Sequence, residues 1–324
     1  MKISRLLIPL HLPLAAAALL AKPKKVGGQA IIEGVMMRGR EKVAMAVRKQ
    51  NGTMVVEHFP FISAARKIRF WRYPVMRGAA NLYESLVLGY KTLSRSADIA
   101  MEEERESKGE TVEPGKKKAG DTIASWASFA FALLVSIGLF MYAPMWILSH
   151  FVPKDSSLLF NALAGAIRII LFLAYLILIS RWKEMRRVFE YHGAEHKAIF
   201  TYEDDKPLSL DNMRPYTTLH PRCGTSFLLL VALVCILLFS IVDAIFIQFI
   251  GPYPSVFARL LVHFSLIPLV GGTSYELLKL SDRYRRLPIV GALIMPGLWL
   301  QKITTRQPDD SQLEVAAEAL KAAL

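Results

Sequence analysis

The sequence predicts an α-helical membrane protein with a small α+β domain outside the membrane. Of its 324 residues 53% are hydrophobic, and the mean hydropathy is +0.33. The apolar residues gather in long runs with almost no charge: 122–153 and 260–275 contain none, 156–180 contains only Arg168, and 223–258 contains only Asp243. A helix needs about 20 residues to cross the hydrocarbon core. A soluble helix would also show a polar stripe at every third or fourth position, and these runs show none.

The apolar runs predict four transmembrane helices, at residues 123–150, 157–180, 226–250 and 256–279. A fifth apolar stretch, residues 287–300, is too short to span comfortably and contains two prolines and two glycines. We expect it to be a re-entrant or interfacial segment. The loops near Pro153 and Pro252 are short, and every long basic segment lies at the opposite helix ends. The positive-inside rule then places both terminal segments in the cytoplasm.

The net charge of +13 is explained mainly by membrane topology. Lys and Arg flank the apolar runs, as at 181–183 and 283–286, which is the bias of cytoplasmic loops. No nucleic-acid partner is expected, because no groove-binding or base-stacking element accompanies the basic residues. The segment Arg66–Arg77 interleaves basic and aromatic residues. It is typical either of a surface that binds anionic lipid headgroups or of a solvated basic face.

The chain divides into regions of different composition. Residues 1–25 resemble a signal peptide, but Pro9 and Pro13 interrupt the apolar stretch, so cleavage, surface anchoring and a dispensable leader stay open. The remaining regions are a basic cytoplasmic α+β domain (26–100), a polar linker (101–121), the membrane domain (122–302) with a His/Cys loop (181–225), and a cytoplasmic tail (303–324) that ends in a helix.

The α+β domain is predicted from a hairpin signal. Asn51-Gly52 stands between the β-prone runs 43–47 and 53–56, and both turn residues accept positive φ. Residues 29–37 are expected to add a strand, and residues 81–99 an amphipathic helix.

Two histidines and a glutamate stand together between the second and third predicted spans. Residues 191–197 read Tyr-His-Gly-Ala-Glu-His-Lys, which places His192 and His196 at i and i+4, on one face of a helix. This spacing suits one metal ion, and the order His-x-x-Glu-His is that of inverted zinc proteases. In that chemistry the carboxylate takes a proton from the metal's water, so Glu195 is the predicted catalytic base.

A second ligand pair follows in the same loop. His220 and Cys223 are three positions apart, a spacing typical of zinc loops. We therefore expect a divalent metal, with zinc favoured, held by His192, His196, His220 and Cys223. Four ligands would close a structural site, whereas three would leave a position for water and a catalytic role. The alternative is that the histidines cap helices or bind lipid phosphate.

Three ionisable residues in the apolar runs are further candidates, because charge at membrane depth is costly and is usually retained for function. Arg168 lies in mid-span and needs a partner inside the bundle, for which Asp243 and Glu276 are the available carboxylates. This pair could also be purely structural. Glu276 has an alternative partner in Lys279, one turn along the same helix.

Several blocks of the chain resemble a known family. Residues 27–39, GGQAIIEGVMMRG, are similar to the opening of the YqhQ-like bacterial membrane proteins, a domain-of-unknown-function family. Further blocks that resemble this family are 192–197, 220–227, 274–276, 296–301 and 304–308, so the resemblance covers about residues 26–322. It implies a multi-pass protein of the bacterial inner membrane and a metal-dependent enzyme, with no established substrate or reaction.

The leading hypothesis is a metal-dependent enzyme, a hydrolase that acts on a lipid-linked or membrane-embedded substrate at the cytoplasmic face. The second is a non-catalytic scaffold, chaperone or assembly factor, in which the metal staples the loop 181–225 and the domain 26–100 docks a protein partner. A transporter is third: Arg168, Asp243 and the broken last segment favour it, but mid-span polar residues are few. None of these observations predicts an oligomeric state.

Overall fold

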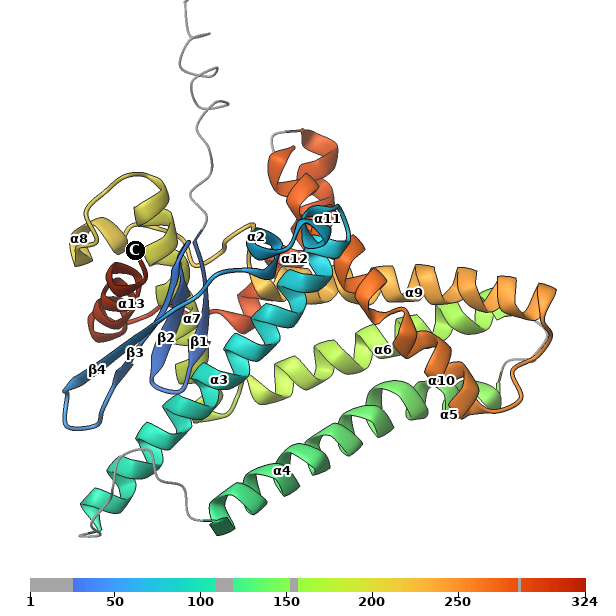
Figure 1. Cartoon of the computed structure of the whole chain (residues 1–324), viewed down its shortest axis with the longest axis horizontal. Coiled ribbons are helices and arrows are strands. Elements are labelled where there is room, and N and C mark those ends of the chain that lie inside the picture. Colours follow the sequence, from blue (N-terminus) through green and yellow to red (C-terminus); the bar gives the residue numbers. More distant parts are fainter. Residues whose placement is uncertain (1–25, 109–118, 152–156, 285–286) are drawn as a thin grey trace, which may run out of the picture.

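The computed structural model describes residues 26–108, 119–151, 157–284 and 287–324. The leader 1–25 and residues 109–118 of the expected linker lie outside the described residues. The described part is mostly helical and contains a four-stranded antiparallel sheet near the N-terminus (Figure 1). The strands, in their order in the sheet, are β1 (Gly27–Ile31), β2 (Gly34–Arg38), β3 (Lys42–Arg48) and β4 (Met54–Pro60).

The predicted hairpin is confirmed, and the strand before it differs from expectation. Asn51-Gly52 lies in the turn between β3 and β4, where Gly52 has a φ of +84°. Residues 29–37 do not form one strand, because the chain reverses at Ile32 and Glu33 to pair β1 with β2. Glu33 has a φ of 49°, as a tight reversal requires.

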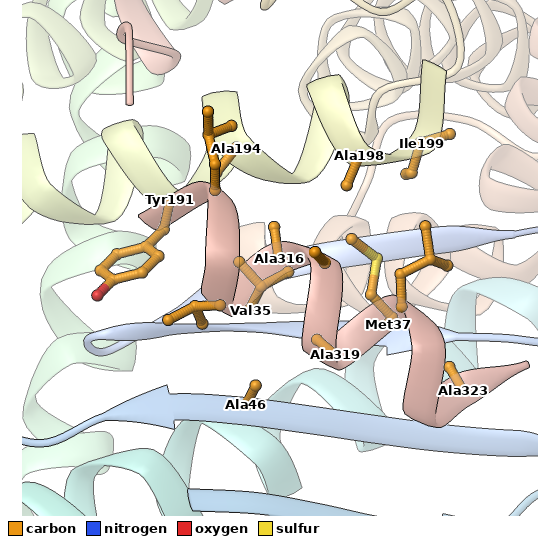
Figure 2. Close-up of a cluster of buried hydrophobic side chains, with 14 of the residues drawn as sticks. Val35, Met37, Ala46, Tyr191, Ala194, Ala198, Ile199, Ala316, Ala319 and Ala323 are labelled. Atoms are coloured by element: carbon orange, nitrogen blue, oxygen red, sulfur yellow. The ribbon is translucent and has the colours of Figure 1, made fainter. Parts of the chain in front are cut away.

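The sheet is the middle layer of three (Figure 1). Helix α3 (Met76–Ser107) covers one face, and α7 (Lys183–Glu203) and α13 (Asp310–Ala323) cover the other. Strand β3 alternates accordingly: Ala44 and Ala46 face α7 and α13, and the residues between and beside them face α3. Figure 2 shows the apolar cluster in which β2 and β3 meet α7 and α13. Both faces are buried, which explains why β2 and β3 read as nearly continuous apolar runs.

Two helices differ in the structure from the division into regions that the sequence suggested. The tail helix is not a separate appendage, since Leu313, Val315 and Leu320 of α13 are buried in the core of the sheet domain. Helix α3 continues to Ser107, into the residues expected to form the linker. Before α3 come the short helices α2 (Ala64–Lys67) and η1 (Arg69–Arg72). Their lipid contact remains a prediction.

Three helical stretches are long and apolar enough to cross a membrane: Trp126–Leu148, Ala162–Ile179 and Gly224–Phe249. The first comprises most of α4 (Ala119–Ile137), the π-helical turn η2 (Gly138–Tyr142) and α5 (Ala143–Ser149). The other two belong to α6 (Ser157–Ile179) and α9 (Gly224–Phe249).

The fourth expected span is a bent pair of helices. Helices α10 (Val256–Ser265) and α11 (Ile267–Arg283) meet at an angle of 43° and pass the length and hydropathy test only together. Pro268 in the first turn of α11 lacks a backbone N–H, which favours a break at this point. The described residues thus contain three such helices, or four if the pair counts as one span. The short apolar stretch forms α12 (Pro288–Thr304), 17 residues long with Pro296 inside it.

Candidate metal centre

His192, His196 and Cys223 come together at the junction of the sheet domain and the apolar helices. One ligand atom from each lies within 4.8 Å of the other two. The expected helical spacing is confirmed, because both histidines lie on α7 and their rings are 4.5 Å apart. Cys223 precedes α9, and its Sγ is 3.2 Å from Nε2 of His192. Two imidazoles and one thiol at these distances are a donor set that binds Zn²⁺ or a similar ion.

The backbone fixes the tautomers of both histidines. Nδ1 of His192 is 2.8 Å from the carbonyl oxygen of Thr304, and Nδ1 of His196 contacts the carbonyl oxygen of Thr218. A carbonyl can only accept a hydrogen bond, so Nδ1 of each neutral ring carries the proton and donates it. Nε2 of each ring is then unprotonated, and its lone pair can bind a metal ion. Metal-binding histidines have this arrangement, in which the second nitrogen is anchored to a carbonyl.

Cys223 is the N-cap residue of α9, and its Sγ accepts a hydrogen bond from the backbone N–H of Thr225 at 3.4 Å. Burial opposes ionisation of the thiol, but a protonated His196 beside the sulfur and the hydrogen bonds from Thr225 outweigh burial and lower the pKa of Cys223. The partial positive charge at a helix N-terminus also stabilises a thiolate and so lowers the pKa of the thiol further. Burial also lowers the pKa of His196, which favours the neutral ring that a metal needs.

Glu195 is buried between α7 and β1. Its side chain is 4% exposed, and its carboxylate accepts a hydrogen bond from the backbone N–H of Gly28. Burial raises its pKa to about 8, although the nearby charge of His192 opposes that shift. Glu195 is thus an ionisable group beside the ligand triad, outside the set of three.

Gly28 leaves the space that the Glu195 carboxyl group occupies. A Cβ at position 28 would lie 2.8 Å from Cγ, Cδ and Oε1 of Glu195. Gly28→Ala is therefore expected to destabilise the protein by about 1–3 kcal/mol through overpacking, measured as a lower melting temperature. The matched control is Gly27→Ala, because a Cβ at Gly27 has nothing within 4 Å. Equal melting temperatures for the two variants would contradict this packing.

His220 lies next to the triad but outside the group of three. Its ring is 5.5 Å from that of His196, and Gln301 holds its backbone through two hydrogen bonds of 2.7 and 2.8 Å. Nδ1 of His220 accepts from the backbone N–H of Arg222, and Nε2 is 3.6 Å from a carboxylate oxygen of Glu203. The described side chains thus bring three of the four predicted ligands together, and coordination by His220 stays a prediction.

The comparison with known proteins agrees with the sequence blocks. Residues 73–324 match DUF1385, described as a protein of unknown function. The chain belongs to the DUF1385 family. Its relative YqhQ of Bacillus subtilis (strain 168), described as an uncharacterized protein, is 32% identical over 308 residues, which are 92% of this chain and 91% of that protein. The predicted family resemblance is confirmed. No solved structure matches the chain.

The other candidate residues of this DUF1385 protein lie apart from the triad. Glu276 of α11 forms a two-fold ion pair with Arg77 of α3. Arg168 donates to the carbonyl oxygen of Phe140, in the π-helical turn, at 3.0 Å. The hydrogen bonds to Asp243 come from α10 and the turn before it; their donors are Tyr253, Arg259 and His263. Among the described side chains no hydrogen bond joins Arg168 to Asp243 or Glu276, so the expected pairing of these charges stays a prediction.

Sequence reasoning missed the residues that orient the ligands. Thr304, Gln301 and Gly28 all lie in blocks that carried the family resemblance, so that resemblance was the available signal. Thr218 carried no such signal, because it contributes a backbone carbonyl that any residue type possesses.

Proposed function

We propose that this protein is a metal-dependent hydrolase of the bacterial inner membrane, acting at the cytoplasmic face on a lipid-linked or membrane-embedded substrate. The observation that carries the proposal is the triad: His192, His196 and Cys223 converge, with Nδ1 of each histidine bound to a backbone carbonyl. Three protein ligands leave a fourth position for water in a tetrahedral site, which is the arrangement of catalytic rather than structural zinc.

Each group has a distinct task in this proposal. His192, His196 and Cys223 would hold the ion, and the carbonyls of Thr218 and Thr304 keep the imidazoles in the binding tautomer. A bound divalent metal lowers the pKa of its water to about 7. Glu195 accepts the proton that the attacking water loses and returns it to the leaving group of the substrate. The water adds across the bond that breaks, so no further reactant is needed.

The position of the triad supports a membrane substrate. Cys223 is the residue immediately before α9, the most apolar of the three candidate spans. Helix α7, which holds the histidines, follows α6 after three residues. We propose that a substrate whose apolar part stays in the bilayer reaches the site at this junction. A soluble substrate has no comparable reason to meet this protein at the membrane.

The proposed orientation places the sheet domain in the cytoplasm, and cysteine labelling tests it. Lys67→Cys, at an exposed position, and Glu318→Cys, where the native side chain is 45% exposed, are expected to react with a membrane-impermeant maleimide only after cells are permeabilised. Asp155→Cys, between the first two spans and outside the described residues, is expected to react in intact cells. Cys235 is replaced by Ser in all three to remove background. Labelling of position 67 or 318 in intact cells would contradict the orientation.

Replacing Glu195 by Gln tests catalysis. Gln keeps the shape and can still accept from the Gly28 N–H, but it cannot carry the proton. Glu195→Gln is expected to retain metal and melting temperature and to fail to complement a deletion strain, with a loss of about 100-fold or more if activity is assayed. Glu184→Gln, at an exposed position of the same helix, is the matched control and is expected to complement.

Two other outcomes point to other functions. Full complementation by Glu195→Gln together with failure of His196→Ala would indicate a scaffold stapled by a metal. Metal-free protein that needs Cys223 but tolerates Glu195→Gln would indicate a thiol nucleophile. The latter is the second candidate, because Sγ of Cys223 caps a helix and lies 3.2 Å from Nε2 of His192.

A further inference from the structure

A cavity with a polar lining lies next to the triad. A cavity of about 520 Å³ is bounded by the first half of α7, the turn before α9 and the end of α12 with the segment that follows it. Its lining contains three cations, Arg186, Lys302 and Arg306, and a single carboxylate, Glu190. Three threonines line it as well and offer hydroxyl donors. The lining is therefore cationic and rich in hydrogen-bond donors.

Glu190 neutralises only one of the three cations of the lining. Glu190 pairs with Arg186 at 3.4 Å, and its other oxygen accepts from the amide of Gln312 at 3.0 Å. Among the residues that the structure describes, neither Lys302 nor Arg306 has an ion-pair partner. Two positive charges of the cavity are thus left for a ligand.

Arg306 is also incompletely satisfied. Within the described part of the chain, its Nε is buried and has no hydrogen-bond partner, while one terminal nitrogen makes only a long contact of 3.4 Å with the carbonyl of Ser180. A buried guanidinium N–H without an acceptor is costly and uncommon. A ligand with several acceptor oxygens would satisfy it.

The cavity and the triad share structural parts. Thr218 lines the cavity and provides the carbonyl that anchors His196. Thr305 lines it too and contacts the Thr218 hydroxyl at 3.2 Å, while the preceding residue, Thr304, provides the carbonyl for His192. One anchoring carbonyl thus belongs to a lining residue, Thr218, and the other belongs to Thr304, the neighbour of the lining residue Thr305. A ligand in the cavity would therefore lie close to the proposed metal centre.

We propose that this cavity binds a phosphate group of the substrate, so that the substrate of the proposed hydrolase is a phosphate-bearing molecule. The inference rests on the proposed function. Arginine forks and hydroxyl donors match the several oxygens of a phosphate ester. Lys302 of its lining lies near the end of the apolar helix α12, and Arg306 contacts the carbonyl of Ser180, the residue after α6. A lipid headgroup can therefore bind in the cavity while its chains stay among the apolar helices.

Calorimetric titration of the detergent-purified full chain tests the proposal with two probes, inorganic phosphate and dihexanoyl phosphatidic acid. The protein is first treated with a chelator, so that a bound metal cannot retain the phosphate. Lys302→Ala, at an exposed position, and Arg306→Gln are each expected to weaken binding about tenfold or more, since each removes a charge-assisted hydrogen bond. Lys183→Ala, an exposed lysine of α7 outside the cavity lining, is the matched control and is expected to bind like the wild type.

Each outcome separates this inference from the metal proposal. Binding of both probes, or of either one, supports a phosphate site and identifies the source as free phosphate or lipid. Lack of binding by the wild type, or equal binding by Lys302→Ala, overturns the inference even if metal content is stoichiometric. Phosphate binding that responds to Lys302→Ala in a protein that never binds metal keeps the phosphate site and removes the hydrolase.

Discussion

Replacing His192 and His196 together by alanine is expected to reduce metal content from near one ion per chain to background. Both Nε2 lone pairs are lost, and Cys223 alone cannot hold a divalent ion against solvent. Metal bound at a concentration a thousand times its Kd stabilises the folded state by about 4 kcal/mol. The double variant is therefore also expected to lose the rise in melting temperature that added Zn²⁺ causes in the wild type. Elemental analysis and thermal unfolding of detergent-purified protein measure the two effects.

Two single variants serve as comparisons. His58→Ala, at an exposed position of β4 far from the triad in the chain, is expected to keep its metal. His220→Ala decides whether the shell is open: retention of metal supports three protein ligands, and loss supports four and a structural site. Wild-type protein without metal, and without a response to Zn²⁺, would contradict the centre itself.

Gly193→Ala is expected to destabilise the protein strongly, because it adds a methyl group where another segment packs against α7. A Cβ at this position would lie 2.0 Å from the carbonyl oxygen of Arg306 and 3.0 Å from Cγ2 of Thr218. The segment after α12 would have to move away from α7, and with it the carbonyl of Thr304 that anchors His192. We expect a loss of about 3 kcal/mol, together with weaker metal binding.

A loss of stability in Gly193→Ala would be informative, because helix propensity alone predicts a gain. In a helix interior alanine is favoured over glycine by about 1 kcal/mol, so a destabilised Gly193→Ala variant reports tertiary packing alone. Gly138→Ala provides the comparison, since a Cβ at Gly138 has nothing within 4 Å. Thermal unfolding with metal analysis measures both variants. A Gly193→Ala protein as stable as the wild type, with its metal retained, would refute the contact between α7 and the 304–306 segment.

Part of the fold and of the site could be predicted because its signals are local. The Asn51-Gly52 turn, the apolar runs and the i, i+4 spacing of His192 and His196 each depend on residues close in the chain. The break between α10 and α11 was not predicted, because hydropathy records how apolar a run is and is insensitive to a 43° bend.

The sequence by itself predicted four membrane-spanning helices, a domain that contains a hairpin, and two histidines on one helical face with the spacing of metal ligands. The described residues contain three such helices, or four if α10 and α11 count as one span. Only the tertiary structure decided which distant segments meet. It placed α13 against the sheet, Gly28 against Glu195, and the Thr304 carbonyl on His192, 112 positions away. The reason is that apolar burial has no direction: a buried face must be covered, but its own residues do not specify by which segment.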